Sequence, residues 1–401
     1  MKKKIAIVGG GTAGLFLASF LDVNLFDITI YEKKGTLGRK FLVAGDGGFN
    51  LSHAEEMSRF VERYTPVDFL HSSLLAFTNQ DLQAWLSTIG IETFVGSSQR
   101  IFPVKGIKPI QVLDAILAHL TARGVKLVVN YTFTGWDVNG DLVFNKNEIV
   151  RTDFNVFALG GASWAKTGSD GSWLDIFTSK GIDTIPFTAQ NCAFGIDWSA
   201  DFIKSHAGKP LKNIALSFED QIQKGELVVT EFGLEGNAIY ALSPNIQQAL
   251  AIQGNATIYL DLKPTWTVEV VLKKLENAKQ KISSILKQDI KLSTASIALL
   301  KQSLSKEEFL NLPILSQSIK KLPIVLTGAA PIDEAISTSG GIALSAVNTN
   351  FELLQIKNNF CIGEMLDWSA PTGGYLVHGC AAMGVKLARN LKARGSGYDD
   401  G

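Results

Sequence analysis

The sequence predicts an α/β fold in which one domain is interrupted by an inserted module, and three observations support this. Residues 4–31 combine a glycine cluster with a strand–helix–strand pattern. The composition changes near residue 187, where short alternating apolar runs begin. Glycine-rich character returns after residue 337. We therefore expect residues 1–187 and 337–401 to form one domain and residues 188–336 to form an insert.

Length and charge limit the classes of function. At 401 residues the chain exceeds the usual size of a single core, so two or three packed parts are expected. Its 38 basic and 38 acidic residues cancel. Nucleic acids and anionic membranes normally require a basic excess, so we expect neither as a partner. A small-molecule substrate is favoured, and the oligomeric state is left open.

The cysteines and the start of the chain indicate a cytoplasmic protein. Only Cys192, Cys361 and Cys380 occur, without CxxC spacing, which suits a reducing compartment and offers no metal ligand set. The basic Met1–Lys4 segment resembles a signal peptide, but Gly9 breaks the apolar stretch after four residues. No run of about 18 apolar residues could span a bilayer.

The first 32 residues predict a βαβ unit that binds a dinucleotide. Residues 4–8 form an apolar run, residues 12–22 have helical spacing, and residues 27–31 read as a second strand. Between the first strand and the helix lies the pattern G-x-G-x-x-G, which starts at Gly9. Glu32 ends the second strand, eighteen residues beyond Gly14.

Each part of this pattern has a mechanical role. Gly9 permits a tight turn, Gly11 lets the backbone approach a pyrophosphate, and Gly14 lets helix and strand pack closely. The helix N-terminus stabilises the phosphate charge. Glu32 would accept hydrogen bonds from the adenosine ribose, and an acid there disfavours a 2′-phosphate. Both NAD and FAD suit this arrangement.

Later segments favour FAD over NAD. The segment Gly38-Arg39-Lys40 opens a glycine-containing loop, residues 44–50, directly after the βαβ unit. Residues 158–161 (Ala-Leu-Gly-Gly) follow a buried strand, and residues 360–364 lead through Asp367 to the Thr-Gly-Gly-Tyr run at 372–375. An extended FAD needs such returns of the chain along its ribityl and ring portions. A nicotinamide dinucleotide domain usually does not.

The remaining pattern alternates helices and strands before the insert begins. Helices are predicted over residues 80–89 and 109–123, and strands over residues 125–130 and 154–159. In the insert, residues 188–262 and 322–336 are β-rich, whereas residues 263–321 are lysine-rich and helical. A further helix is expected from His378 onward.

These segments resemble the bacterial family of FAD-dependent oxidoreductases called aminoacetone-oxidase-like. Four segments carry the resemblance, Gly9–Gly14, Gly38–Asn50, Gly160–Gly171 and Ser339–Gly384, and Arg100–Val104 followed by Val112–Ala115 adds a fifth match. The resemblance implies a glutathione-reductase-type FAD-binding Rossmann domain with an inserted β-barrel and helical module that covers the flavin. The chain departs from the family at Gly48 and Phe49, where arginine and cysteine are usual, and at Ala165, which replaces a proline.

The resemblance also implies roles around a non-covalently bound FAD. Glu364, and with it Asp367, would bond a ribityl hydroxyl, while the amides of residues 372–374 would stabilise negative charge at flavin N1–O2. NAD(P)H is a candidate transient electron donor, since a second dinucleotide unit is not evident. The expected cofactor-binding residues are Gly9, Gly11, Thr12, Ala13, Gly14, Glu32, Lys33, Gly38, Arg39, Lys40, Asn50, Ala158, Gly160, Gly161, Gly363, Glu364, Asp367, Thr372, Gly373, Gly374 and Tyr375.

The sequence does not identify the catalytic residues. His378 is a candidate proton donor, although a histidine at a helix start is more often a structural hydrogen-bonding residue. Arg100 is a candidate anchor for an anionic substrate, although solvated loop arginines are commoner. Three functions therefore compete: hydride transfer between flavin N5 and a small organic substrate, oxidation of an amine or hydroxy compound by oxygen, and service in RNA modification or as a binding module. The even charge balance counts against the third.

Overall fold

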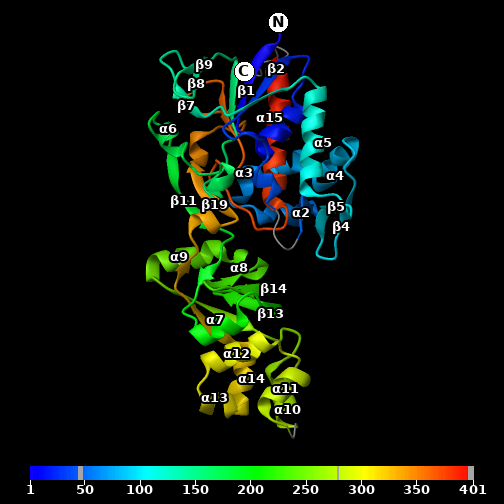
Figure 1. The fold of residues 1–401 in the computed structure, drawn as a ribbon, viewed down its shortest axis with the longest axis vertical. Coiled ribbons are helices and arrows are strands. Elements are labelled where there is room, and N and C mark those ends of the chain that lie inside the picture. The colour runs from blue at the N-terminus through cyan, green and yellow to red at the C-terminus, as the bar shows by residue number, and fades with distance from the viewer. Residues whose placement is uncertain (44–47, 278–279, 396–401) are drawn as a thin grey trace. The chain divides into compact units, whose positions relative to one another are not determined.

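The computed structural model describes residues 1–43, 48–277 and 280–395. Residues 44–47, which belong to the predicted glycine loop, lie outside the described residues. The chain divides into two compact units (Figure 1). Residues 1–188 and 336–401 form the first unit, and residues 189–335 form the second. Each unit has its own hydrophobic core.

A five-stranded parallel sheet forms the centre of the first unit. Its strands, in spatial order, are β20 (Asn359–Cys361), β10 (Phe154–Phe157), β1 (Lys3–Val8), β2 (Phe26–Glu32) and β6 (Lys126–Val129). Residues 5–8 and 154–157 are fully buried, as expected for strands covered on both faces. The chain order reverses between β1 and β10, and α/β proteins bind ligands at the carboxyl ends of strands at such a switch point.

Helices surround this sheet. They are α1 (Thr12–Phe20), α2 (Met57–Phe60), α3 (Val67–Ala76), α4 (Asn79–Thr88), α5 (Pro109–Ala122), α6 (Leu174–Thr178) and α15 (Tyr375–Gly395). Helix α1 packs against α15, and Gly384 lies at their contact. A Cβ at residue 384 would lie 2.7 Å from the backbone nitrogen of Leu17, so glycine is required there. Short 3-10 turns are η1 (Lys40–Leu42), η2 (Val61–Arg63), η3 (Ala165–Thr167) and η5 (Leu344–Ala346).

Three smaller sheets complete the first unit. The strands β3 (Ser52–His53), β5 (Arg100–Pro103) and β4 (Thr93–Val95) form an antiparallel sheet in that spatial order. The strands β7 (Phe133–Trp136), β8 (Leu142–Phe144) and β9 (Glu148–Val150) form a meander that packs on the central sheet through aromatic contacts of Phe157. The strand β11 (Thr184–Gln190), where the chain leaves the unit, pairs with β19 (Ser337–Ile342), where it returns.

The second unit is built on a seven-stranded antiparallel sheet. Its order is β17 (Leu322–Leu326), β16 (Ala256–Asp261), β13 (Pro210–Phe218), β14 (Gln221–Val229), β15 (Gly233–Glu235), β12 (Phe194–Gly195) and β18 (Gly328–Ala329). The first and last strands are consecutive in the chain, so one stretch pairs with β16 through its first half and with β12 through its second half. This stretch closes the sheet in the manner of a barrel.

Helices account for the rest of the second unit. They are α7 (Ala200–His206), α8 (Asn237–Tyr240), α9 (Ser243–Gln253), α10 (Val268–Glu276), α11 (Ile282–Gln288), α12 (Thr294–Ser303), α13 (Lys306–Leu310), α14 (Leu312–Lys320) and the 3-10 turn η4 (Ile332–Glu334). Side-chain caps from Thr267, Ser293, Ser305 and Asn311 start α10, α12, α13 and α14, which explains why this stretch breaks into short helices.

The fold class predicted from the sequence is confirmed: a Rossmann-type parallel sheet carries additional antiparallel modules. Two details differ from expectation. The helix predicted from His378 begins at Tyr375, directly after two glycines. The stretch 188–262, predicted as β-rich, also contains α7, α8 and α9, because short helices with weak apolar periodicity leave little signal in a sequence.

Candidate functional site

The glycine turn between β1 and α1 leaves room for a ligand. Gly9 has φ +111°, and a Cβ there would lie 2.3 Å from the carbonyl oxygen of Ala158. A Cβ on Gly14 would likewise lie 2.3 Å from the Gly9 carbonyl oxygen, so only glycine lets α1 lie this close to the strand. A Cβ on Gly11, in contrast, would meet no protein atom within 4 Å. The backbone is therefore open at the position where the sequence predicts the pyrophosphate.

Glu32 holds the turn in shape from the end of β2. Its Oε2 accepts a hydrogen bond from the Gly10 amide at 2.9 Å, and its Oε1 accepts one from the Lys34 amide at 2.9 Å. The Gly38 amide in turn donates to the Gly10 carbonyl at 2.8 Å. Each carboxylate oxygen keeps a lone pair for a further donor. The predicted ribose contact of Glu32 stays a prediction.

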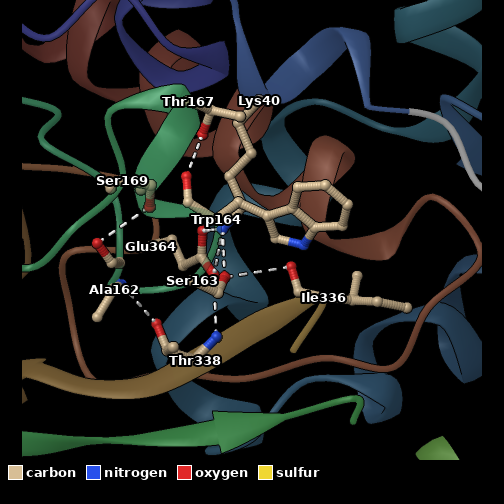
Figure 2. A network of polar contacts seen from close by, with 12 residues as sticks. Lys40, Ala162, Ser163, Trp164, Thr167, Ser169, Ile336, Thr338 and Glu364 are labelled. Carbon is tan, nitrogen blue, oxygen red and sulfur yellow. Dashed lines mark hydrogen bonds and ion pairs between the residues drawn. The ribbon is translucent and has the colours of Figure 1, made fainter. Parts of the chain in front are cut away.

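The basic residues after β2 divide into those that contact protein and one that joins a polar cluster. Lys33 pairs with Asp170 at 2.7 Å, and Arg39 donates to the Lys166 carbonyl at 3.4 Å. Lys40, at the start of η1, points to the centre of the network in Figure 2. Its ammonium donates to Ser163 Oγ at 2.8 Å and pairs with Glu364 at 2.9 Å.

The Lys40 cluster, comprising Lys40, Ser163, Thr338 and Glu364, joins segments from four parts of the chain (Figure 2). Lys40 follows β2, Ser163 follows β10, Glu364 follows β20, and Thr338 lies on β19. Glu364 Oε1 also accepts from the Thr338 amide at 3.0 Å. A Cβ on Gly161 would lie 2.1 Å from Thr338 Oγ1, so only glycine allows these segments to meet. The cluster fixes the chain at the carboxyl edge of the parallel sheet.

Asp367, three residues after Glu364, also holds β19 in place. Its Oδ1 accepts a hydrogen bond from the Gly340 amide at 2.8 Å, and its own amide donates to the Ile342 carbonyl at 3.0 Å. Gly363 has φ +84° and approaches the Cβ of Ala13, which places the segment against the start of α1. Glu364 and Asp367 therefore both position β19, and their proposed bonds to a ribityl hydroxyl stay predictions.

The start of α15 is held by the segment that follows the glycine loop. Gly373 and Gly374 have φ values of +116° and +99°, and a Cβ on Gly374 would lie 2.5 Å from the backbone of Ser52. Asn50, two residues earlier, donates to the Gly48 carbonyl at 3.4 Å. The two segments that the sequence places beside the flavin ring, around residues 48–50 and 372–375, thus come close together.

The half-buried carboxylate of Glu55 strengthens this junction. Glu55 accepts hydrogen bonds from the Tyr375 hydroxyl and from the Arg63 guanidinium, whose Nη2 lies 2.9 Å away. Burial alone would raise the pKa of the Glu55 carboxyl, but the bonds from Arg63 and Tyr375 outweigh it and hold that pKa below its usual range. The His53 ring stacks on Tyr375 with centroids 5.2 Å apart. These four residues, Glu55, Arg63, Tyr375 and His53, are called the Glu55 clamp below.

The structure does not support His378 as a proton donor at the flavin. Its side chain is fully buried, Nδ1 lies 2.9 Å from Ser52 Oγ, and Nε2 lies 2.9 Å from the Phe77 carbonyl oxygen. Burial lowers the pKa of this imidazole to about 4, so it is neutral at physiological pH. The alternative reading of a helix-start histidine as a structural residue is therefore the correct one.

Arg100 differs from the other cations near the site. On β5 it lies beside the Gly373 turn, where its Nε is 3.4 Å from the position a Cβ would take. Lys33, Lys40 and Arg63 all have an acidic partner. No acceptor for the Arg100 guanidinium is found among residues 1–43, 48–277 and 280–395. The Arg100 side chain is half-buried, and among the described residues its guanidinium has no acidic or carbonyl partner.

The residues present fit an FAD. The open backbone at Gly11, which precedes the first residue of α1, suits a pyrophosphate, and the loops after β1, β2, β10 and β20 meet along one edge of the sheet. Most of the predicted cofactor-binding residues lie on these loops or at the start of α15. Within the described part of the chain, His, Cys, Asp and Glu side chains form no group of three that could hold a metal ion. In the same part, no helix is long and apolar enough to cross a membrane.

Comparison with known proteins gives the family. The family model described as "HI0933-like protein Rossmann domain" matches residues 3–390. The chain belongs to this family. It is thus an FAD-dependent oxidoreductase, a flavoprotein of the Rossmann class, as the sequence predicted.

Two characterised relatives align over almost their whole length with this member of the HI0933-like family. The ribosomal RNA dihydrouridine synthase of Haemophilus influenzae is 22% identical, with 92% of this chain and 93% of the relative covered. The 3-dehydro-bile acid delta(4,6)-reductase of Clostridium scindens is also 22% identical, with 98% and 99% covered. An open flavocytochrome c3 fumarate reductase matches 98% of this chain and 78% of its own, at 14% identity and a TM-score of 0.53. This structural likeness concerns the fold alone.

Sequence reasoning missed several residues of the site. Glu55, Arg63 and His53 lie in no recognisable motif, and the spacing of His53 suggests neither metal binding nor a nucleophilic triad. Ser163 and Thr338 carry the Lys40 cluster, but each hydrogen bond joins residues more than a hundred positions apart or crosses between strands. The glycines that flank them were the only available signal.

Proposed function

We propose that the protein uses non-covalently bound FAD to reduce a carbon–carbon double bond conjugated to a carbonyl group in a small organic substrate. The observation that carries the proposal is Arg100, whose guanidinium has no partner in the described part of the chain and lies beside the Gly373 turn that we expect to face the flavin. When bound, FAD supplies a hydride at N5. Arg100 would donate a hydrogen bond to the carbonyl oxygen, which becomes negative as the hydride reaches the β-carbon.

The reaction also requires a proton for the second carbon of the double bond. The substrate gains a hydride at one carbon and a proton at the other, and the flavin returns to its oxidised state. Because His378 is neutral and fully enclosed, the proton would come from solvent. The electron donor that reduces the flavin again would be NAD(P)H, visiting transiently.

The names of the two relatives support this class of reaction. A dihydrouridine synthase and a delta(4,6)-reductase each form a saturated bond in a conjugated ring. Uridine in RNA carries the same conjugated bond as a small enone does. We favour the small molecule, because the 38 basic and 38 acidic residues leave no excess of positive charge for a polyanion.

A flavin-reduction assay tests the proposal. The purified holoprotein is mixed anaerobically with NADPH or NADH, and the loss of the oxidised flavin absorbance is followed. Cyclic enones, a uridine-containing RNA and simple amines are then supplied separately. Reoxidation of the reduced flavin by the enones is the expected result. Bleaching of the oxidised flavin by amines, followed by reoxidation only with oxygen, would instead establish an oxidase, and reoxidation by RNA alone would establish a nucleic-acid substrate.

A further inference from the structure

One face of the small antiparallel sheet has a composition that its structural role does not explain. Along β5, Ile101 and Pro103 are buried, whereas Arg100 and Phe102 are only half-buried. Alternate residues of a strand point to opposite faces, so Arg100 and Phe102 share the outer face. A strand needs apolar side chains on its buried face only. The outer face therefore carries a large ring without a packing requirement.

The neighbouring strands extend the same face. In the antiparallel register, His53 of β3 lies opposite Arg100, and Phe94 of β4 lies opposite Phe102. Directly paired residues project from the same side of a sheet. The Phe94 and Phe102 rings lie 5.7 Å apart at an angle of 27°, and the Phe94 side chain is 45% exposed. His53, Phe94, Arg100 and Phe102 thus form one surface, called the platform below.

The platform lies between the two segments expected to face the flavin. At one end, a Cβ on Gly48 would approach the Phe102 ring at 3.3 Å. At the other end, Arg100 lies beside Gly373. The aromatic rings and the guanidinium therefore border both segments.

The chemistry of the platform specifies what it can bind. Two half-exposed rings offer a flat apolar surface on which a planar hydrocarbon can stack. The Arg100 guanidinium offers a charged donor that a carbonyl or other oxygen anion can satisfy. His53 cannot take the place of the cation, because burial and the charge of Arg63 lower the pKa of its imidazole although Glu55 opposes them. The ligand is expected to carry one oxygen at the edge of a flat apolar body.

We propose that the platform is the substrate-binding surface, and that the substrate is a flat, largely apolar molecule whose carbonyl oxygen accepts a hydrogen bond from Arg100 while its body lies on Phe94 and Phe102. This assignment rests on the proposed function, since it places the reacting carbonyl at Arg100. It adds the class of substrate that this chain would select.

Binding of a non-reacting probe tests the platform separately from turnover. p-Hydroxybenzaldehyde, which has a flat ring and an ionisable oxygen, is titrated into the FAD-loaded protein while the flavin absorbance is monitored. Arg100→Met should weaken binding by at least about tenfold, and Arg100→Lys should restore part of it. Phe94→Ala should weaken binding several-fold. The matched control is Val95→Ala on the same strand, since Val95 is also 45% exposed but points to the opposite face.

The outcomes separate the two proposals. Wild-type affinity in both Arg100→Met and Phe94→Ala, or no binding by the wild type, overturns the platform while enone reduction can persist. Arg100-dependent binding without reduction of any enone supports the platform and overturns the proposed function. The midpoint of urea unfolding should be unchanged in Arg100→Met. A large decrease would show that the guanidinium has a structural partner and would also overturn the platform.

Discussion

The first unit contains two polar regions that join different segments of the chain through similar side chains. The Lys40 cluster joins the loops that follow parallel strands, and its acid, Glu364, contacts a lysine and a backbone amide. The Glu55 clamp joins an antiparallel strand segment to the start of α15, and its acid, Glu55, contacts an arginine and a tyrosine. The first region fixes the edge where a cofactor fits. The second fixes the helix start beside which Arg100 lies.

The comparison shows where this chain keeps charge available. In the Lys40 cluster the lysine and the carboxylate neutralise each other, with side chains 27% and 14% exposed. In the Glu55 clamp Arg63 pairs with Glu55, and among the described residues no acidic side chain pairs with the nearby Arg100. The lysine at the cofactor edge therefore has an acidic partner, whereas Arg100 beside the clamp has none in the described part of the chain.

The largest effect is expected from two glycine substitutions at the cofactor edge. Gly14→Ala should destabilise the fold by about 3 kcal/mol, because the new Cβ would lie 2.3 Å from the Gly9 carbonyl oxygen. Gly11→Ala should cost less than about 1 kcal/mol, since Gly11 has φ −84° and open space around it. Urea unfolding of the apoprotein and FAD titration measure the two effects. If Gly11→Ala binds FAD as the wild type does, the open backbone there is not the pyrophosphate site.

A smaller effect, on FAD binding, is expected when two acids of similar burial, Glu364 and Glu352, are each changed to glutamine. Glu364→Gln should weaken FAD binding by about 1–3 kcal/mol, because Lys40 and the Thr338 amide lose a charged acceptor. The matched control is Glu352→Gln, whose side chain is 13% exposed and pairs with Arg394 at 2.7 Å away from the cluster. FAD titration of both apoproteins decides. Equal losses of affinity in the two variants would mean that the Lys40 cluster acts through general stability.

A further effect concerns the pH dependence of stability and tests the packing around His378 beside the clamp. The pKa of His378 is about 4 in the folded protein and about 6.5 when exposed. Between these values the unfolded chain binds a proton that the folded protein does not, so this residue lowers stability as the pH falls from about 6.5 towards 4. The stability difference between the wild type and His378→Asn should therefore shrink by about 2 kcal/mol from pH 7 to pH 5.

Urea unfolding at several pH values provides the measurement. Other groups that titrate in this range affect both proteins alike, so the difference between them isolates His378. His378→Gln serves as a second variant in case the shorter amide does not reach both Ser52 and Phe77. A constant difference across the pH range would show that the imidazole takes up its proton in the folded state.

The parts of the fold that could be predicted are those that depend on patterns of residues close together in the sequence. The strand–glycine turn–helix unit with Glu32 could be predicted because its glycines, its helix start and its terminal acid occur at a fixed spacing along the first 32 residues. The pair Gly373-Gly374 likewise indicated a helix start nearby, and in the structure both glycines have positive φ values directly before α15. The segments around Gly160 and Glu364 were recognised because they follow buried strands whose carboxyl ends meet.

The parts that could not be predicted depend on pairing across long separations. Glu55 and Tyr375 are 320 positions apart, and Lys40 and Glu364 are 324 apart. Neither spacing leaves a periodic signal. The fully enclosed position of His378 follows from helices α2 and α3 packing around α15, through Phe60 at 4.8 Å and the Phe77 carbonyl. Burial of this kind is a property of the tertiary fold, so the sequence allowed both readings of the histidine.

The pairing of β11 with β19 bears on how such a protein can be assembled from parts. The hydroxyls of Thr188 and Ser339 lie 2.7 Å apart, so the chain leaves the first unit and returns to it at neighbouring points. A tight turn of a few residues is long enough to join such ends. The first unit is therefore continuous in space although it is divided in the gene. During evolution, the second unit could be gained, lost or exchanged between β11 and β19 without a change in the fold of the first unit.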